Sequence, residues 1–284
     1  MSAYREQGVV FNCGENRLVG IAAVPEITAE VGVLILVGGP QYRVGSHRQF
    51  TLLARNLAAA GFASLRFDYT GMGDSEGDAQ EFDQVEADIS AAIEAMLETI
   101  PGVCRVVLWA LCDAASSAMM FAHRHSQVTG MILLNPWVHH GEYSPEVKLT
   151  HYYRPSFWRK DQWRRLLFGE IRLIPAFKEL ATDALALVVK RSLPTVRQQA
   201  QRSFVHDMLD GLLRFRHGIL IVLSEADITA SEFKVLIAQD ADWKAAISRP
   251  LITTHAVGGA DHTFSEPLWQ EEVEQLTIGW LKGL

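Results

Sequence analysis

Residues 106–118 have the sequence VVLWALCDAASSA, and this stretch decides the fold. It opens with four apolar residues, mostly β-branched or aromatic, which is typical of a fully buried strand. A run of small residues from Ala114 to His125 then predicts a helix. A tight turn from strand to helix tolerates only small neighbours two residues before and after its apex, and Ala110 and Ala114 fill those positions. We therefore expect the Cys112 thiol, at the apex, to be held above the sheet.

Cys112 also has a plainer interpretation. Free cysteine is among the most buried residue types, so a cysteine beside a core strand is often just a small hydrophobic side chain. The stretch also lacks the serine and both glycines of the usual G-x-S-x-G elbow. The rest of the chain decides between the two interpretations.

The composition is that of an ordinary globular protein of 284 residues, 49% apolar and 21% charged. Its net charge of −7 argues against a general nucleic-acid-binding role. No apolar segment opens the chain, and no apolar run reaches the length of about 18 residues that predicts a membrane span, so we expect a cytoplasmic protein. Its three cysteines are too few and too scattered for a disulfide framework or a zinc site, which predicts reduced thiols and no metal.

Strand-like and helical segments alternate along the chain. This alternation predicts a mostly parallel sheet, with helices on both faces and ligands at the carboxyl ends of its strands. The first two strands form an antiparallel hairpin. The expected strands are 9–12, 17–24, 31–37, 63–67, 106–109, 130–135, 219–223 and 251–257, and the expected helices are 48–60, 84–99, 114–125, 231–239 and 267–281.

The alternation is interrupted between residues 137 and 206. This span has no clear strand, is rich in aromatic residues, and holds 12 Lys and Arg against 6 Asp and Glu. We expect a helical cap over 137–206, inserted into a core formed by 1–136 and 207–284. Two interpretations of the cations stay open: they are solvated faces of helices, or they place the cap against an anionic membrane.

Three polar residues follow strands in the order nucleophile, acid, histidine: Cys112, Asp227 and His262. This is the order of the α/β-hydrolase arrangement, with the cap between nucleophile and acid. Asp261 competes as the acid, but a side chain adjacent to His262 in sequence rarely orients its imidazole. The three positions together predict a Cys-His-Asp catalytic triad.

The triad predicts acyl chemistry. A thiol at a helix N-terminus beside an imidazole ionises near neutral pH, so Cys112 would attack an acyl carbonyl and form a thioester. The backbone N–H of Asp113 is one expected oxyanion donor, although the Asp113 carboxylate would oppose thiolate formation unless it points away. The second donor normally comes from the loop after strand 31–37, where Pro40 has no N–H to give. Gln41 is the expected replacement, through its backbone or its side chain.

Other residues are candidates for binding roles. An anionic substrate group could bind Arg43, His47 and Arg48 near the mouth of the site, although a plain solvated loop explains them equally well. No cofactor is expected, because the glycines of 71–73 lack the third glycine of a dinucleotide fingerprint and 39–45 lacks the Lys-Ser/Thr of a phosphate-binding loop. His139, His140 and His151 lack the carboxylate or cysteine partners of a metal site.

Four segments carry a resemblance to a known family: 38–48, 67–75, 111–116 and 259–264. Together they resemble the type 1 exosortase A system-associated hydrolases, bacterial α/β hydrolases found with exopolysaccharide and PEP-CTERM protein-sorting gene clusters. The resemblance spans nearly the whole chain and implies an α/β-hydrolase fold, but it specifies no substrate. The nucleophile of α/β hydrolases is normally serine, and dienelactone hydrolases show that cysteine can replace it.

Three functions fit these observations. The first is hydrolysis of an ester or thioester of a small-molecule acyl substrate. The second is transfer of the acyl group to a sugar or another alcohol, which the link to exopolysaccharide clusters suggests. The third is a non-catalytic binding protein that has kept the fold, which the missing serine, the missing glycines and Pro40 suggest. The sequence leaves the oligomeric state open.

Overall fold

The computed structural model describes residues 3–39, 41–138 and 196–284, the last of these without the side chains of 196–203. Residues 1–138 and 206–284 form one compact unit. Most of the cap that we expect over 137–206 lies outside the described residues, so the cap stays a prediction.

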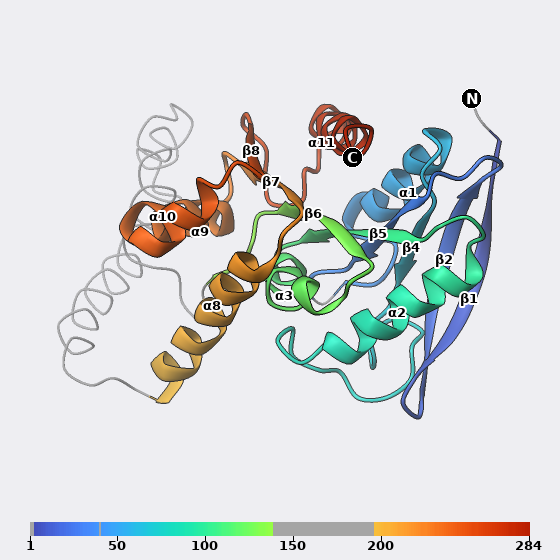
Figure 1. Ribbon diagram of the computed structural model, residues 1–284, viewed down its shortest axis with the longest axis horizontal. Helices are drawn as coiled ribbons and strands as arrows, with labels where there is room; N and C mark the ends of the chain where they lie inside the picture. Colours follow the sequence, from blue (N-terminus) through green and yellow to red (C-terminus); the bar gives the residue numbers. More distant parts are fainter. Residues whose placement is uncertain (1–2, 40, 139–195) are drawn as a thin grey trace, which may run out of the picture. The chain divides into compact units, whose positions relative to one another are not determined.

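A central eight-stranded sheet runs through this unit in the order β1-β2-β4-β3-β5-β6-β7-β8 (Figure 1). The strands β3 to β8 pair in parallel, and the hairpin β1–β2 joins them by antiparallel pairing of β2 with β4. The bounds are β1 Tyr4–Cys13, β2 Asn16–Pro25, β3 Val31–Leu36, β4 Ser64–Phe67, β5 Arg105–Leu111, β6 Val128–Leu134, β7 Gly218–Ser224 and β8 Ile252–Val257.

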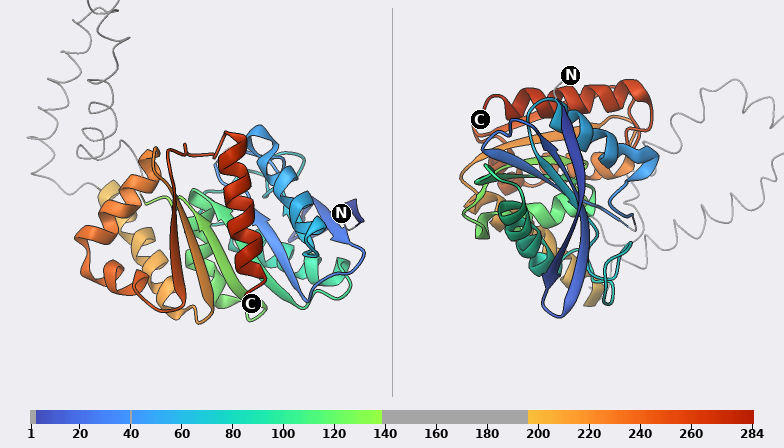
Figure 2. Two further views of the ribbon diagram at one scale, coloured as in Figure 1. Left: turned by 90° about the horizontal axis from the view of Figure 1, so that it is seen from above. Right: turned by 90° about the vertical axis from the view of Figure 1, so that its right-hand side faces the viewer.

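Helices cover both faces of the sheet. The helices α1 and α11 lie over one face, and α2, α3 and α8 lie over the other, as the two turned views also show (Figure 2). The helices α9 and α10 follow β7 and precede β8. The helix bounds are α1 Gln49–Ala59, α2 Glu86–Thr99, α3 Asp113–Phe121, α8 Val196–Arg214, α9 Ile228–Gln239, α10 Ala241–Ile247 and α11 Pro267–Leu281.

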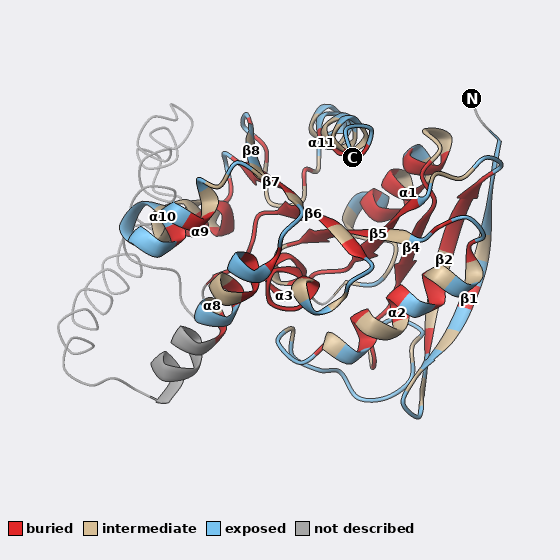
Figure 3. Cartoon of the chain, in the orientation of Figure 1, coloured by how far each residue is buried: buried red, intermediate tan, exposed pale blue. Residues whose placement is uncertain are grey.

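The core lies between the sheet and its two helical layers (Figure 3). Every residue of β3 is buried, as expected for a continuous apolar run in a strand covered on both faces. The helix α1 turns Phe50, Leu53 and Leu57 to the sheet, so its apolar residues occupy a single stripe. Burial on both faces leaves the carboxyl ends of the parallel strands as the place where polar side chains can gather.

The expected alternation is confirmed, with differences in detail. Each of the eight expected strands and five expected helices is present, but β1 begins at Tyr4 rather than Val9 because it pairs with the whole of β2. The short helix α10 was not expected; it begins because the Asp240 carboxylate accepts hydrogen bonds from the N–H groups of Asp242 and Trp243.

Within the described part of the chain, no helix has the length and apolar character needed to cross a membrane.

Candidate active site

The turn between β5 and α3 places Cys112 in a strained conformation. Its φ of 62° and ψ of −127° lie in a region that favours glycine, and it precedes the first residue of α3. The neighbouring side chains of Ala110 and Ala114 are buried, which leaves no room for larger residues beside the turn. The Cys112 N–H donates to the Leu134 carbonyl at 2.9 Å, which ties the turn to the end of β6. This is the geometry of a nucleophile elbow.

The loops after β7 and β8 bring Asp227 and His262 together. The distance from His262 Nδ1 to Asp227 Oδ2 is 3.0 Å. The same carboxylate oxygen accepts the Ala230 N–H at 2.9 Å, so Asp227 also caps the N-terminus of α9. The hydrogen bonds to His262 and Ala230 hold the Asp227 carboxylate in one orientation, and the carboxylate in turn fixes the imidazole ring.

The third member of the group, Cys112, lies near the His262 imidazole, so that its side chain acts on the pKa of that ring. Burial of the ring by itself lowers the pKa of His262, but the hydrogen bonds and charges of Asp227 and Cys112 outweigh burial and raise the pKa to about 10. A protonated imidazole is therefore stabilised between an acid and a thiol. The sequence-predicted members of the triad lie together in the order Cys112, His262, Asp227.

Asp261, the competing acid, is directed elsewhere. Its carboxylate accepts hydrogen bonds from the N–H groups of Thr263 and Ser265 at 3.2 and 3.0 Å and from the Ser265 hydroxyl. It stabilises the turn that follows His262. Its carbonyl oxygen accepts the Ser224 hydroxyl at 2.8 Å, so the chain is held on both sides of this aspartate.

Two buried residues that sequence reasoning missed support the His262 loop. Asn135, at the end of β6, donates to the His262 carbonyl at 3.1 Å and to the Ser224 hydroxyl at 2.9 Å. Its own side-chain oxygen accepts the Ser224 N–H at 2.8 Å. Asn135 has a φ of 44°, which asparagine tolerates better than most residues. A polar residue directly after the apolar run 130–134 was the signal that could have found it.

The side chain of Asp113 turns back toward the expected oxyanion donors. Its Oδ1 accepts the Gly39 N–H at 2.7 Å and the Ala114 N–H at 2.8 Å, and its own N–H also contacts the carboxylate. Burial raises the pKa of Asp113, while these backbone hydrogen bonds and the charge of His262 oppose the rise. A Cβ on Gly38 would stand 2.1 Å from the Leu111 carbonyl oxygen and 2.8 Å from Asp113 Oδ1, so this loop fits closely against the elbow.

The backbone N–H and the side-chain oxygen of Gln41, the expected second oxyanion residue, are engaged within its own loop. Its N–H donates to the Gly39 carbonyl at 2.8 Å, and its side-chain oxygen accepts the Ser46 N–H at 2.9 Å. The structure therefore does not present the Gln41 N–H as a free donor.

Of the three expected anion-binding residues, Arg43 is already paired. Its guanidinium binds the carboxylates of Asp68 and Asp74, and its N–H donates to Asp68 Oδ1 at 2.7 Å. Asp68 is buried, so this pair holds the loop rather than offering a free charge to a substrate. His47 and Arg48 are exposed, and both have positive φ angles. Burial raises the pKa of Asp261, but the hydrogen bonds from Ser265 and Thr263 and, to a smaller extent, the charge of His47 outweigh burial and lower it.

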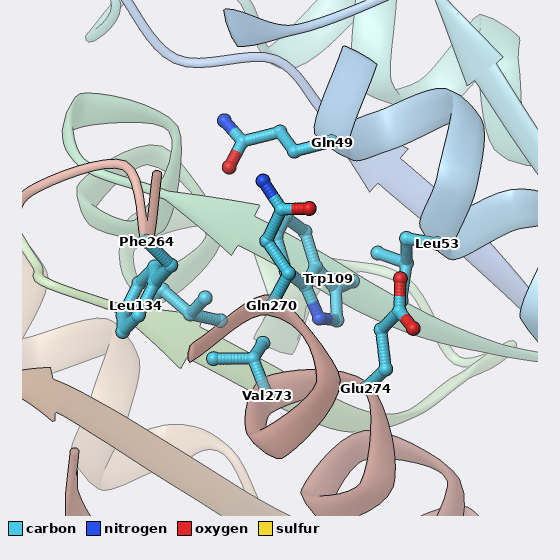
Figure 4. Close-up of a pocket in the computed structure, with 8 residues that line it drawn as sticks. All are labelled: Gln49, Leu53, Trp109, Leu134, Phe264, Gln270, Val273 and Glu274. Atoms are coloured by element: carbon cyan, nitrogen blue, oxygen red, sulfur yellow. The ribbon is translucent and has the colours of Figure 1, made fainter. Parts of the chain in front are cut away.

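A small pocket lies beside the site, between α1 and α11 (Figure 4). Its lining is mostly apolar. Leu134 lies at the end of β6, which pairs with β5, and Phe264 lies in the loop that carries His262. The side chains of Gln49 and Gln270 extend into it (Figure 4). It contains no residue of the triad, so we assign it to packing beneath the site.

Among the described residues, no three His, Cys, Asp or Glu side chains are grouped so as to hold a metal ion. The histidines His139, His140 and His151, considered above, lie outside these residues. The three cysteines are unpaired: Cys13 and Cys112 are partly buried and Cys104 is exposed.

Solved structures with the same fold include several hydrolases. The Pyrococcus furiosus esterase Pf2001 superposes with a TM-score of 0.61 at 14% identity, over 99% of this chain and 92% of that one. Est1E from Butyrivibrio proteoclasticus, solved with ferulic acid bound, gives a TM-score of 0.61 at 15% identity, over 96% of this chain and 99% of that one. Dienelactone hydrolase from Anabaena variabilis gives 0.60 at 13% identity over 99% and 98%. At these identities the likeness establishes the fold.

A family model covers most of the chain. The model described as serine aminopeptidase, S33, matches residues 32–227, which include the elbow and the acid. No curated protein matches the chain. Where the family description specifies a serine, the elbow of this chain carries Cys112. From its fold and this match, the chain belongs to the serine aminopeptidase S33 family of α/β hydrolases.

Proposed function

We propose that this α/β hydrolase cleaves an ester or thioester of a small-molecule acyl substrate, with Cys112 as nucleophile, His262 as acid and base, and Asp227 as the group that orients His262. The observation that carries the proposal is the placement of the strained Cys112 near His262, whose Nδ1 lies 3.0 Å from Oδ2 of the buried Asp227. The esterase neighbours and the family match are consistent with this chemistry.

The first half of the reaction forms a thioester. Cys112 passes its thiol proton to His262, its sulfur attacks the acyl carbonyl carbon to form a C–S bond, and the bond from carbon to the leaving oxygen or sulfur breaks. The imidazolium of His262 gives its proton to the leaving alcohol or thiol. Because the pKa of His262 is raised to about 10, the imidazolium needed for this step persists at neutral pH.

The second half returns the enzyme. His262, now neutral, takes a proton from water, and the hydroxide attacks the thioester carbonyl. The C–S bond breaks, the acid product leaves and the Cys112 thiolate recovers its imidazolium partner. Throughout, Asp227 keeps the proton-bearing Nδ1 of His262 directed toward itself, so that the other ring nitrogen faces the thiol.

The test is intact-protein mass spectrometry after incubation with p-nitrophenyl esters and acyl thioesters of increasing length. Wild type is expected to gain one acyl mass that disappears as substrate is consumed. Cys112→Ala should gain none, and His262→Ala should gain it far more slowly, because the thiol loses its base. Cys104→Ala is the matched control, since Cys104 is exposed and would collect any unspecific label. A persistent adduct in Cys112→Ala, lost in Cys104→Ala, would refute the proposal.

Acyl transfer is the second candidate. It is distinguished in the same experiment by an adduct that accumulates in water and is discharged when a sugar alcohol is added. A non-catalytic binding role would be favoured if no donor labelled Cys112 and none was turned over.

The narrower family, the cellular location and the membrane contact of the protein are also proposals. Membership of the exosortase-associated hydrolases rests on the four segments that resemble them. A cytoplasmic location fits the three unpaired thiols. Peripheral binding to anionic lipid rests on the basic surplus of residues 137–206, and it should weaken steeply as salt rises.

A further inference from the structure

The carboxylate of Asp113 lies where an oxyanion hole is normally built. In α/β hydrolases the donors come from the residue after the nucleophile and from the loop after the strand that corresponds to β3. Here the first donor, the Asp113 N–H, contacts its own carboxylate, and the Gly39 N–H of that loop donates to Asp113 Oδ1 at 2.7 Å. The Ala114 N–H, in the first turn of α3, adds a bond of 2.8 Å.

These donors bind a carboxylate as they would bind a tetrahedral oxyanion. Both are negatively charged oxygens, and the N-terminus of a helix attracts either. In this loop Pro40 has no N–H, and the Gln41 N–H donates to the Gly39 carbonyl. The close fit of Gly38 against Leu111 and Asp113 Oδ1 leaves the carboxylate enclosed on that side.

We propose that the Asp113 side chain is an internal plug, which fills the oxyanion hole in the resting enzyme and must rotate out before the acyl carbonyl can be polarised. The inference rests on the proposed function, because it presumes that Cys112 attacks a carbonyl. While the plug is in place, kcat/KM for small activated esters is low. A substrate that displaces the carboxylate restores the oxyanion hole.

A buried hydroxyl is available to receive the displaced carboxylate. Tyr69 is 5% exposed, and among the described residues its hydroxyl has no hydrogen-bond partner. Burial raises the pKa of Tyr69, and the negative charges of Asp113 and Asp88 raise it further. An unpartnered buried hydroxyl is costly, and a bond to the Asp113 carboxylate in the open position would relieve that cost.

The test compares three variants with p-nitrophenyl butyrate. Asp113→Ala removes the plug and frees the Gly39 and residue 113 N–H groups, so kcat/KM should rise at least ~10-fold, given that one oxyanion donor is worth about 100-fold or more in kcat. Asp113→Asn is the matched control, because it removes the charge but keeps an oxygen that can accept the same N–H groups. It should stay within about 3-fold of wild type by the same reasoning. Asp113→Ser, with a shorter side chain, replaces the alanine variant if that one unfolds.

The outcomes separate the alternatives. Equal gains in Asp113→Ala and Asp113→Asn would mean that charge alone slows the thiolate, and would overturn the plug. A loss in Asp113→Ala would give the carboxyl a helpful role in turnover and would also overturn it. If mass spectrometry finds no acyl group on Cys112 in any of these proteins, the proposed function itself fails. Acylation in wild type without activation by Asp113→Ala refutes the plug alone.

The role of Tyr69 is tested by a double-mutant cycle. Tyr69→Phe should lower kcat/KM in the wild-type background, where it removes the partner of the displaced carboxylate. It should have no effect in the Asp113→Ala background, where no carboxylate needs a partner. Equal losses in both backgrounds would show that the hydroxyl does not receive Asp113.

Discussion

His262 links the chemistry of the site to the stability of the fold. Its pKa is raised from 6.5 to about 10 in the folded protein, against burial and through Asp227 and Cys112. A histidine that binds its proton more tightly when folded stabilises the fold wherever that proton is bound. This contribution is complete below about pH 6.5, the ordinary value for histidine, and is lost as the pH rises through the folded pKa.

We therefore expect the free energy of unfolding of wild type, minus that of His262→Gln, to fall steadily between pH 6.5 and 10. Urea unfolding at pH 6, 8 and 10 measures it. His255→Gln is the matched control, because His255 also contacts a carboxylate, that of Glu272 at 3.0 Å, but on the surface. The pH trend should survive in that variant. A difference that grows with pH would contradict the ion pair of His262.

The backbone of Cys112 carries strain that can be measured separately. Its φ of 62° and ψ of −127° cost a non-glycine residue about 1–3 kcal/mol. Cys112→Gly should therefore raise the free energy of unfolding by about 1 kcal/mol or more relative to Cys112→Ala, which keeps the strain. Both variants should lose acylation. Equal stabilities, measured by urea unfolding, would show that the elbow is relaxed.

At the scale of elements, Arg43 holds the loop after β3 in place rather than offering its charge to a substrate. Arg43 binds Asp68, whose side chain is fully buried, and Asp68 also accepts the Asp74 N–H at 3.1 Å. Arg43→Ala would leave a buried carboxylate without its cation, which costs about 3–5 kcal/mol.

Thermal and urea unfolding of Arg43→Ala measure this loss, and a raised KM on its own would instead favour the substrate-binding role. Arg17→Ala is the control: Arg17 makes a similar pair with Glu76, but both side chains are exposed, so its removal should matter far less.

The elements themselves were predictable from the sequence to a large extent. Continuous apolar runs such as β3 and β7 are typical of strands buried on both faces, and the apolar stripe of α1 indicates which side of that helix faces the core. The order of Cys112, Asp227 and His262 along the chain predicted which residues meet. Spacing could not predict the Asn135–Ser224 pair, because those residues are 89 positions apart and meet only when β6 and β7 align. Nor could it predict that Asp113 folds back on its own N–H, since a side-chain rotamer leaves no pattern in the sequence.

At the scale of the whole molecule, the site is assembled from two stretches of chain. Cys112 belongs to residues 1–138, while Asp227 and His262 belong to 206–284, and the two stretches form one compact unit. They are joined through β6 and β7, which pair in parallel from Gly130–Gly218 to Leu134–Val222 and are almost wholly buried.

A protease site engineered between residues 139 and 195 tests this joint. After cleavage the two pieces should still elute together in size-exclusion chromatography, because the shared sheet and core hold them, and they should separate in urea. Cys112 acylation before and after cleavage then reports whether the intervening chain takes part in the reaction. Separation without denaturant would show that the sheet alone is insufficient.

The double attachment of Asp227 bears on how this protein can evolve. Because its carboxylate also starts α9, selection for folding alone would preserve it in a descendant that had lost all turnover. The strained residue at position 112 gives the fold no such benefit, and a silent lineage would drift there toward glycine. Among distant relatives, the residue at the elbow should therefore record whether the ancestral reaction persists, while the aspartate should not.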